Sequence, residues 1–162
     1  MPIVYLGLGS NLDAEANLRL ASRELRNRFG LPKISAVYRN KAMGFDGDDF
    51  LNAVACIETR LSPHELCAEL EEIHRVAGRE RTSEKYSSRT LDIDLLLYDQ
   101  LVIDDPPVRV PREDVLQFSF VLGPLAEIAP DYRHPVTGRL ISEHWQEFDT
   151  AGHPLTKLGG TL

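Results

Sequence analysis

Two carboxylates, Asp92 and Asp94, stand two positions apart in a run of apolar residues. This alternation predicts a strand over residues 91–98, with the aspartates on one face and their Cα atoms about 7 Å apart. The opposite face then carries side chains that point into a core, namely Leu91, Ile93, Leu95 and Leu97. Carboxylates held this close repel each other unless a cation lies beside them. Oxygen ligands favour a hard cation such as Mg²⁺, which commonly brings phosphate oxygens with it.

Basic residues precede this strand in a segment, 77–90, that has neither helical nor strand periodicity. Long aperiodic segments in compact domains are usually surface loops with a function. The cations of this region are Arg75, Arg79, Arg81, Lys85 and Arg89. Guanidinium groups bind phosphate through paired hydrogen bonds, so acids and arginines together indicate nucleotide phosphoryl chemistry. Each pattern alone is also typical of a solvated surface on which arginines merely offset the aspartates.

Hydrophobic periodicity predicts the elements that must position these residues. The expected strands are 3–8, 33–39, 50–59 and 91–98, and the expected helices are 13–29 and 62–76. Their order is that of a split βαβ motif, an α+β fold with an antiparallel sheet and helices on one face. C-terminal additions are expected to be a hairpin at 100–110, a helix at 119–129 and a flexible tail at 149–162.

Local signals mark where the two helices begin. Residues 62–65 (Ser-Pro-His-Glu) form a capping box with proline at the first helical position. Ser10 or Asn11 is expected to cap the first helix. The preceding Gly7-Leu-Gly9 suggests a dinucleotide fingerprint, but Leu12 replaces the third glycine, which favours a tight turn between strand and helix. The remaining possibility is that Ser10 and Asn11 line a ligand site.

Phe50 and Asn52 offer an aromatic ring and an amide on one side of the third strand. A planar heterocycle with ring donors and acceptors is bound by such a pair, through stacking and hydrogen bonds. The alternative is an asparagine that serves only the backbone of the fold.

Composition favours a single globular domain, 1–162, with 43% hydrophobic and 27% charged residues and a net charge of −7. This acidic balance argues against general nucleic-acid binding. The N-terminus lacks the features of a secretory signal, and no apolar run approaches the ~20 residues of a membrane span. We therefore expect a cytoplasmic protein with no membrane partner. Cys56 and Cys67 match no zinc or redox spacing and are expected to be buried thiols.

Several short motifs occur together between residue 3 and about residue 130. They are Gly9-Ser10-Asn11-Leu12, Tyr38-Arg39, Gly44, Phe50-Leu51-Asn52-Ala53, Gly78-Arg79-x-Arg81, Arg89-Thr-Leu-Asp92-Ile-Asp94, Val110-Pro111 and Phe120-Val-Leu-x-Pro124-Leu125. In order and spacing they resemble the 6-hydroxymethyl-7,8-dihydropterin pyrophosphokinase family. The Gly-Arg-x-Arg motif followed by Arg-Thr-Leu-Asp-x-Asp is highly specific.

The resemblance implies a ferredoxin-like core that transfers pyrophosphate from ATP to the pterin hydroxymethyl group in folate biosynthesis and releases AMP. It implies two Mg²⁺ ions at Asp92 and Asp94, with Arg79 and Arg89 as further catalytic residues. The pterin would contact Asn40, Met43, Gly44, Phe50, Asn52 and Phe120. The nucleotide would contact Arg81, Tyr86, Ile93, Arg112 and Glu113. The expected partners are these two small molecules, and a monomer is slightly favoured.

The chain departs from the family's pattern mostly on the nucleotide side. Arg112-Glu113 follow Val-Pro where the family has a histidine, Phe118 replaces an arginine, and His74 replaces a glutamate of the second helix. Arg112 is expected to restore part of the lost positive charge. The alternative is a divergent paralogue that uses a different donor or binds a pterin with weak catalysis.

Overall fold

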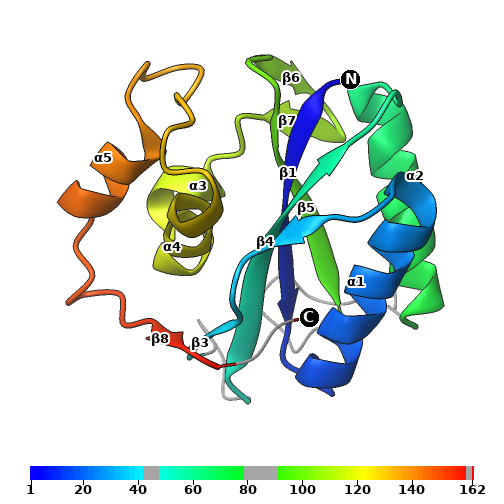
Figure 1. Cartoon of the computed structure of the whole chain (residues 1–162), viewed down its shortest axis with the longest axis horizontal. Coiled ribbons are helices and arrows are strands. Elements are labelled where there is room, and N and C mark those ends of the chain that lie inside the picture. Colours follow the sequence, from blue (N-terminus) through cyan, green and yellow to red (C-terminus); the bar gives the residue numbers. More distant parts are fainter. Residues whose placement is uncertain (42–47, 79–90, 160–161) are drawn as a thin grey trace.

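The computed structural model describes residues 1–41, 48–78, 91–159 and 162. These residues form a six-stranded sheet with helices on both faces and a separate two-stranded hairpin (Figure 1). The strands are β1 Ile3–Ser10, β2 Lys33–Ile34, β3 Tyr38–Asn40, β4 Phe50–Glu58, β5 Asp92–Tyr98, β6 Ile103–Asp105, β7 Val108–Val110 and β8 Thr156–Lys157. The helices are α1 Ala14–Phe29, α2 Pro63–Val76, α3 Asp114–Gln117, α4 Ser119–Ile128 and α5 Ile141–Glu147.

The sheet has the strand order β5-β1-β4-β3-β8, and β2 also pairs with β4. The described strand pairs are antiparallel. The order of β5, β1, β4 and β3 confirms the predicted split βαβ core. Since neighbours run in opposite directions, β1 and β3 end where β4 and β5 begin. One end of the sheet therefore collects Ser10, Asn40, Phe50 and Asp92.

The first core lies between the sheet and the helices α1 and α2, which share one face (Figure 1). Leu18, Ala21 and Leu25 form the buried stripe of α1, as its periodicity predicts. The capping box of α2 is also confirmed. The N–H of Glu65 donates to Ser62 Oγ at 3.2 Å, and Glu65 Oε1 accepts from the Ser62 N–H at 2.9 Å.

The opposite face of the sheet is covered by α3, α4 and α5 (Figure 1). These helices are the C-terminal additions, and the two helices of the split βαβ core share the other face as predicted. Val121, Leu122 and Leu125 of α4 pack with Val54 of β4 in a second core. Although α4 is apolar, no helix in the described part of the chain is both long and apolar enough to cross a bilayer.

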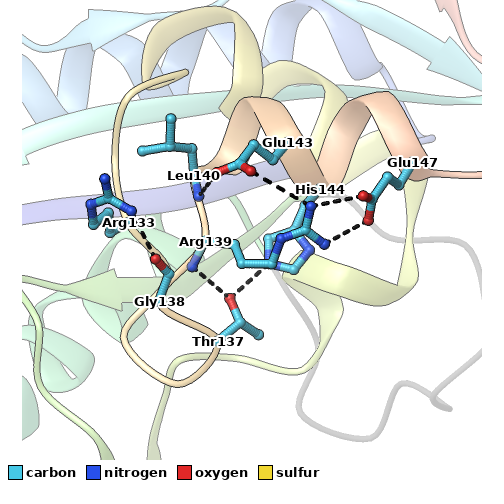
Figure 2. A network of polar contacts seen from close by, with 8 residues as sticks. All are labelled: Arg133, Thr137, Gly138, Arg139, Leu140, Glu143, His144 and Glu147. Atoms are coloured by element: carbon cyan, nitrogen blue, oxygen red, sulfur yellow. Dashed lines mark hydrogen bonds and ion pairs between the residues drawn. The ribbon is translucent and has the colours of Figure 1, made fainter.

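An exposed network of ion pairs fastens α5 to the loop before it (Figure 2). Arg139 makes a two-point contact with Glu147, at 2.6 and 2.7 Å, and lies 3.6 Å from Glu143. Glu143 Oε1 also accepts from the Leu140 N–H at 3.0 Å. The network holds the start of α5 in place, where Ile141 closes the second core.

A β-bulge in β5 changes which residues share a face. The pairing of β5 with β1 shifts register around Leu96, which is an extra residue in the strand. Ile93 and Leu95, before the bulge, face the first core as predicted. Leu97, after it, lies in the second core, so its predicted face is wrong. An uninterrupted alternation cannot reveal such an insertion, because all three leucines are apolar.

The predicted strand 33–39 is in fact two short strands, β2 and β3, which are separated by residues 35–37. The Ser35 N–H donates to Val54 O at 2.9 Å, but the Val54 N–H donates to Ser35 Oγ at 3.0 Å. A hydroxyl thus replaces the backbone carbonyl that would continue the ladder, and the strand is interrupted there.

Neither Ser10 nor Asn11 caps α1, because the helix begins later, after Asp13 with a φ of 44°. Ser10 Oγ donates to Leu12 O at 3.0 Å, and Asn11 Nδ2 donates to Asp48 O at 3.1 Å. Both residues are buried. They hold the turn after β1 and join it to the residue that approaches β4.

The C-terminal segment differs from the flexible tail predicted for 149–162. Within it, β8 pairs with β3. The Leu158 N–H donates to Val37 O at 2.8 Å, and the Leu158 side chain packs against the first core. The outer edge of β3 offers unpaired backbone groups, and these bind the segment although its own composition gives no strand signal.

Candidate active site

The antiparallel register brings four residues into one row across the sheet. Asp92 of β5 lies opposite Gly9, Gly9 lies opposite Asn52, and Asn52 lies opposite Tyr38. Directly opposed residues place their side chains on the same face. This is the α4 face, because Val54, two residues after Asn52, packs in the second core. The carboxylate and the amide predicted from separate motifs thus belong to one surface.

Gly7 and Gly9 leave the strand between these side chains bare. Gly7 lies opposite Asp94. A Cβ atom on Gly9 would lie only 2.9 Å from Asn52 Oδ1, closer than nonbonded atoms normally approach. Both glycines lie within β1, and the turn between strand and helix follows at residues 11–13. The absence of a side chain at Gly9 lets the Asn52 amide approach β1, and the Leu96 side chain lies close to Gly7.

Asp94 lies in an environment that opposes its charge. Desolvation raises the pKa of this carboxyl, Arg112 lowers it, and the neighbouring Asp92 and Asp114 raise it again. Arg112 Nη2 lies 3.9 Å from Asp94 Oδ1, while Arg112 Nε lies 3.3 Å from Asp114 Oδ1. The net direction of the pKa is upward. About 41% of the Asp94 side chain remains exposed, so a cation can still reach it.

The donor set fits a metal that arrives with a phosphate-bearing ligand. Asp92 and Asp94 supply carboxylate oxygens on adjacent positions of one strand face. Among the described residues, no group of three or more histidine, cysteine, aspartate or glutamate side chains could hold a metal by itself. Mg²⁺ is commonly bound by one or two carboxylates, with substrate phosphates and water completing its octahedron.

His74 connects the last turn of α2 to the strand that carries the aspartates. Its ring is buried, with 4% exposure, and Nε2 accepts from the Ile93 N–H at 2.9 Å. Ile93 lies between Asp92 and Asp94, and its own side chain is buried in the first core. The predicted nucleotide contact of Ile93 could therefore be made only by its backbone, and this contact stays a prediction.

Asn52 and Asn40 form a buried amide pair on neighbouring strands. Asn52 Nδ2 donates to Asn40 Oδ1, and the two residues are 6% and 9% exposed. Phe50 lies opposite Asn40 in the register, on the same face of the sheet. The structure thus brings together three of the residues expected to bind the pterin.

Two aromatic rings stack at the beginning of α4. The ring centroids of Phe118 and Phe120 are 5.0 Å apart, and their planes meet at 17°. Both rings pack against the second core, and α4 packs on β4 and β3 (Figure 1). Phe118, which replaces an arginine of the expected pattern, therefore supports the ring of Phe120.

Glu127 is a polar residue that the sequence did not single out. Its carboxylate accepts from Tyr38 OH at 2.5 Å and from the Ala36 N–H at 3.0 Å, and Lys157 Nζ lies 3.7 Å away. It joins α4 to β3 and β8, beside the amide pair. The available signal was its position as an isolated acid in an apolar helix.

Known proteins resemble this chain in sequence and in fold. The model of the 7,8-dihydro-6-hydroxymethylpterin-pyrophosphokinase (HPPK) family matches residues 5–130. The chain belongs to this family. A 2-amino-4-hydroxy-6-hydroxymethyldihydropteridine pyrophosphokinase of Haemophilus influenzae is 36% identical over 162 residues, which cover 98% of this chain and 99% of that protein.

Some longer proteins match this chain over part of their length. Folic acid synthesis protein fol1 of Pneumocystis carinii is 36% identical over 147 residues, 89% of this chain but 20% of its own length. The Plasmodium falciparum HPPK-DHPS structure with pterin and p-hydroxybenzoate has a TM-score of 0.76 at 13% identity, covering 93% of this chain and 43% of that chain. The chain spans less than half of either protein, and the structural likeness shows the fold alone.

Several residues that the HPPK motifs assign to the site lie outside the described residues. They are Met43, Gly44, Arg79, Arg81, Tyr86 and Arg89. Glu113 is exposed and precedes α3, on the Arg112 side of the carboxylates. The roles of these residues stay predictions.

Asp94→Asn is expected to raise the melting temperature in EDTA near neutral pH. The pKa of the folded carboxyl lies above that of the unfolded chain, so its ionisation opposes folding as pH rises through this window. An asparagine carries no such cost. Thermal unfolding near pH 7 and about pH 4 should show a gain that shrinks at the lower pH. Asp131→Asn, at an exposed position, is the control, and an equal gain there would contradict the explanation.

Glu127→Gln is expected to lower stability at neutral pH. Burial raises the pKa of Glu127. The hydrogen bonds from Tyr38 and from the Ala36 N–H lower this pKa by a larger amount, so the net direction is downward. A lowered folded pKa contributes stability above the unfolded value and loses it as pH falls through the folded value. Urea unfolding across this range should show the difference between variant and wild type vanish in acid. A difference independent of pH would indicate lost packing instead.

Proposed function

We propose that this protein transfers the pyrophosphoryl group of ATP to the hydroxymethyl group of 6-hydroxymethyl-7,8-dihydropterin, using Mg²⁺ ions held by Asp92 and Asp94. Membership of the HPPK family makes the chain a pyrophosphokinase of folate biosynthesis that uses ATP. The observation that carries the finer proposal is the row in which Asp92 and Asn52 flank the bare backbone of Gly9. This row supports the proposal because the carboxylate of the proposed metal side and the amide of the proposed pterin side lie on neighbouring positions of one sheet face.

The acidic side of the row binds the reacting phosphates. Asp92 and Asp94 would hold two Mg²⁺ ions, which when bound neutralise phosphate charge and orient the β-phosphorus. Arg112, beside Asp94, adds positive charge on the side of α3. Arg79 and Arg89 are proposed to hold the transferring group. The nucleotide is proposed to contact Arg81, Tyr86, the Ile93 backbone, Arg112 and Glu113.

The amide side of the row binds the pterin. The Asn52 and Asn40 amides supply hydrogen-bond donors and acceptors within a buried part of the sheet. Phe50 and Phe120 provide aromatic faces for stacking on a planar ring. Met43 and Gly44 are proposed to complete this side. Among the solved structures of similar fold, a P. falciparum HPPK-DHPS structure was determined with a pterin.

Orientation is the main contribution of these residues to rate. The carboxylates and the amides lie on hydrogen-bonded strands, so the distance between the two substrates is set by a rigid sheet. Holding two reactants in line converts their encounter into an intramolecular step, which contributes about 7–11 kcal/mol in the best cases. No nucleophilic side chain is required, because the substrate hydroxyl attacks phosphorus.

AMP release should require ATP, Mg²⁺ and the hydroxymethylpterin together. Asp92→Asn and Asp94→Asn are each expected to lower kcat about 10²-fold or more, as for loss of a preorganised electrostatic group. Product analysis by chromatography measures AMP, and Asp131→Asn serves as the matched control. AMP formation by Asp94→Asn at the wild-type rate would refute the metal assignment. The same product analysis with a panel of nucleoside triphosphates shows which donor the protein prefers with an arginine at position 112.

Asn52→Leu should separate the pterin side from the nucleotide side. The leucine keeps the volume but removes a hydrogen-bonding amide, and one lost buried bond costs about 1–3 kcal/mol. The KM for the pterin is expected to rise about 5- to 150-fold, while the KM for ATP stays near that of the wild type. Steady-state kinetics with each substrate varied in turn make the comparison. Equal rises of both constants would place Asn52 outside the pterin contacts.

A further inference from the structure

The strand that carries the aspartates is an edge strand. In the described sheet, β5 pairs with β1 alone, and its other neighbours include α2 and the hairpin strand β7. Backbone N–H groups on such an edge need other acceptors when they are buried. The Ile93 N–H has one, because it donates to His74 Nε2 at 2.9 Å.

This bond acts on the backbone between the two carboxylates. The Ile93 nitrogen belongs to the peptide group that joins Ile93 to Asp92, and Asp94 follows directly in the chain. The orientation of this peptide group determines where both carboxylates point, since their side chains share one face of the strand. The backbone of β5 at the two aspartates is thus held by β1 on one edge and by His74 on the other.

Glu71 determines which nitrogen of His74 can accept. Glu71 lies one helical turn earlier in α2, and its Oε1 is 3.0 Å from His74 Nδ1. An ionised carboxylate only accepts hydrogen bonds, so Nδ1 carries the proton and Nε2 keeps its lone pair for the Ile93 N–H. The imidazole ring is buried, which restricts it to this orientation.

We propose that His74, oriented by Glu71, is a positioning residue that sets the geometry of Asp92 and Asp94 for the divalent cation. This inference rests on the proposed function of the two aspartates. His74 acts on the position of both aspartates through its hydrogen bond with the Ile93 backbone. Loss of a hydrogen-bonded partner behind a metal ligand commonly weakens metal binding about 10- to 100-fold.

The test compares Mn²⁺ binding in the presence of ATP, followed by electron paramagnetic resonance, for wild type and two variants. His74→Leu removes the acceptor and is expected to weaken Mn²⁺ about 10- to 100-fold. His74→Gln keeps an acceptor oxygen and is expected to stay within about threefold of the wild type. His64→Leu is the matched control, because His64 lies in the first turn of the same helix and contacts Asp105 instead. The pterin KM at saturating metal should not change in any of them.

The outcomes separate the two proposals. Absence of Mn²⁺ binding by wild-type protein would refute the metal role of Asp92 and Asp94. Wild-type binding with an unchanged His74→Leu, or an equal loss in His74→Gln, would overturn the role of His74 alone. Nitrogen NMR of the wild type gives a check without any variant, since the inference requires the tautomer protonated at Nδ1. A proton on Nε2 would overturn it even if His74→Leu failed to fold.

Discussion

Mutual repulsion between the neighbouring carboxylates of β5 is the constraint on which the site depends. The fold keeps Asp92 and Asp94 together because β1 binds one edge of their strand and His74 binds the other. Arg112 offsets part of the negative charge, yet the pKa of Asp94 stays above its usual range. Burial, together with Asp92 and Asp114, outweighs Arg112 in this shift, so the ionised form of Asp94 lowers the stability of the protein, and a cation beside it would favour that form.

The second requirement is that the residues proposed for the pterin and those proposed for the phosphates keep a fixed distance. Antiparallel pairing meets it, because the row from β5 to β3 crosses four hydrogen-bonded strands. α4 adds the stacked rings of Phe118 and Phe120, and Glu127 fastens this helix to β3. The C-terminal strand β8 completes the support on the outer side of β3.

Local sequence patterns were sufficient to predict much of the fold and part of the candidate site. The buried stripes of α1 and α2, the capping box and the common face of Asp92 and Asp94 all follow from local spacing. The failures at Ser35, at Leu97 and in β8 share a cause, since each depends on a hydrogen bond or a bulge set by a distant segment. Glu127 was missed because its partner, Tyr38, is also distant in the sequence. The histidine at position 74 is explained by its hydrogen bond with the Ile93 N–H, which the sequence pattern does not show.

Gly9 has a consequence for the design of inhibitors. A Cβ atom there would lie 2.9 Å from Asn52 Oδ1, so the Asn52 amide would have to move before the position could acquire a side chain. A compound that lies across this bare stretch of main chain would contact atoms that every substitution retains. Mutations that confer resistance would then have to occur in residues around the edge of the bound compound, where a substitution lowers its affinity less.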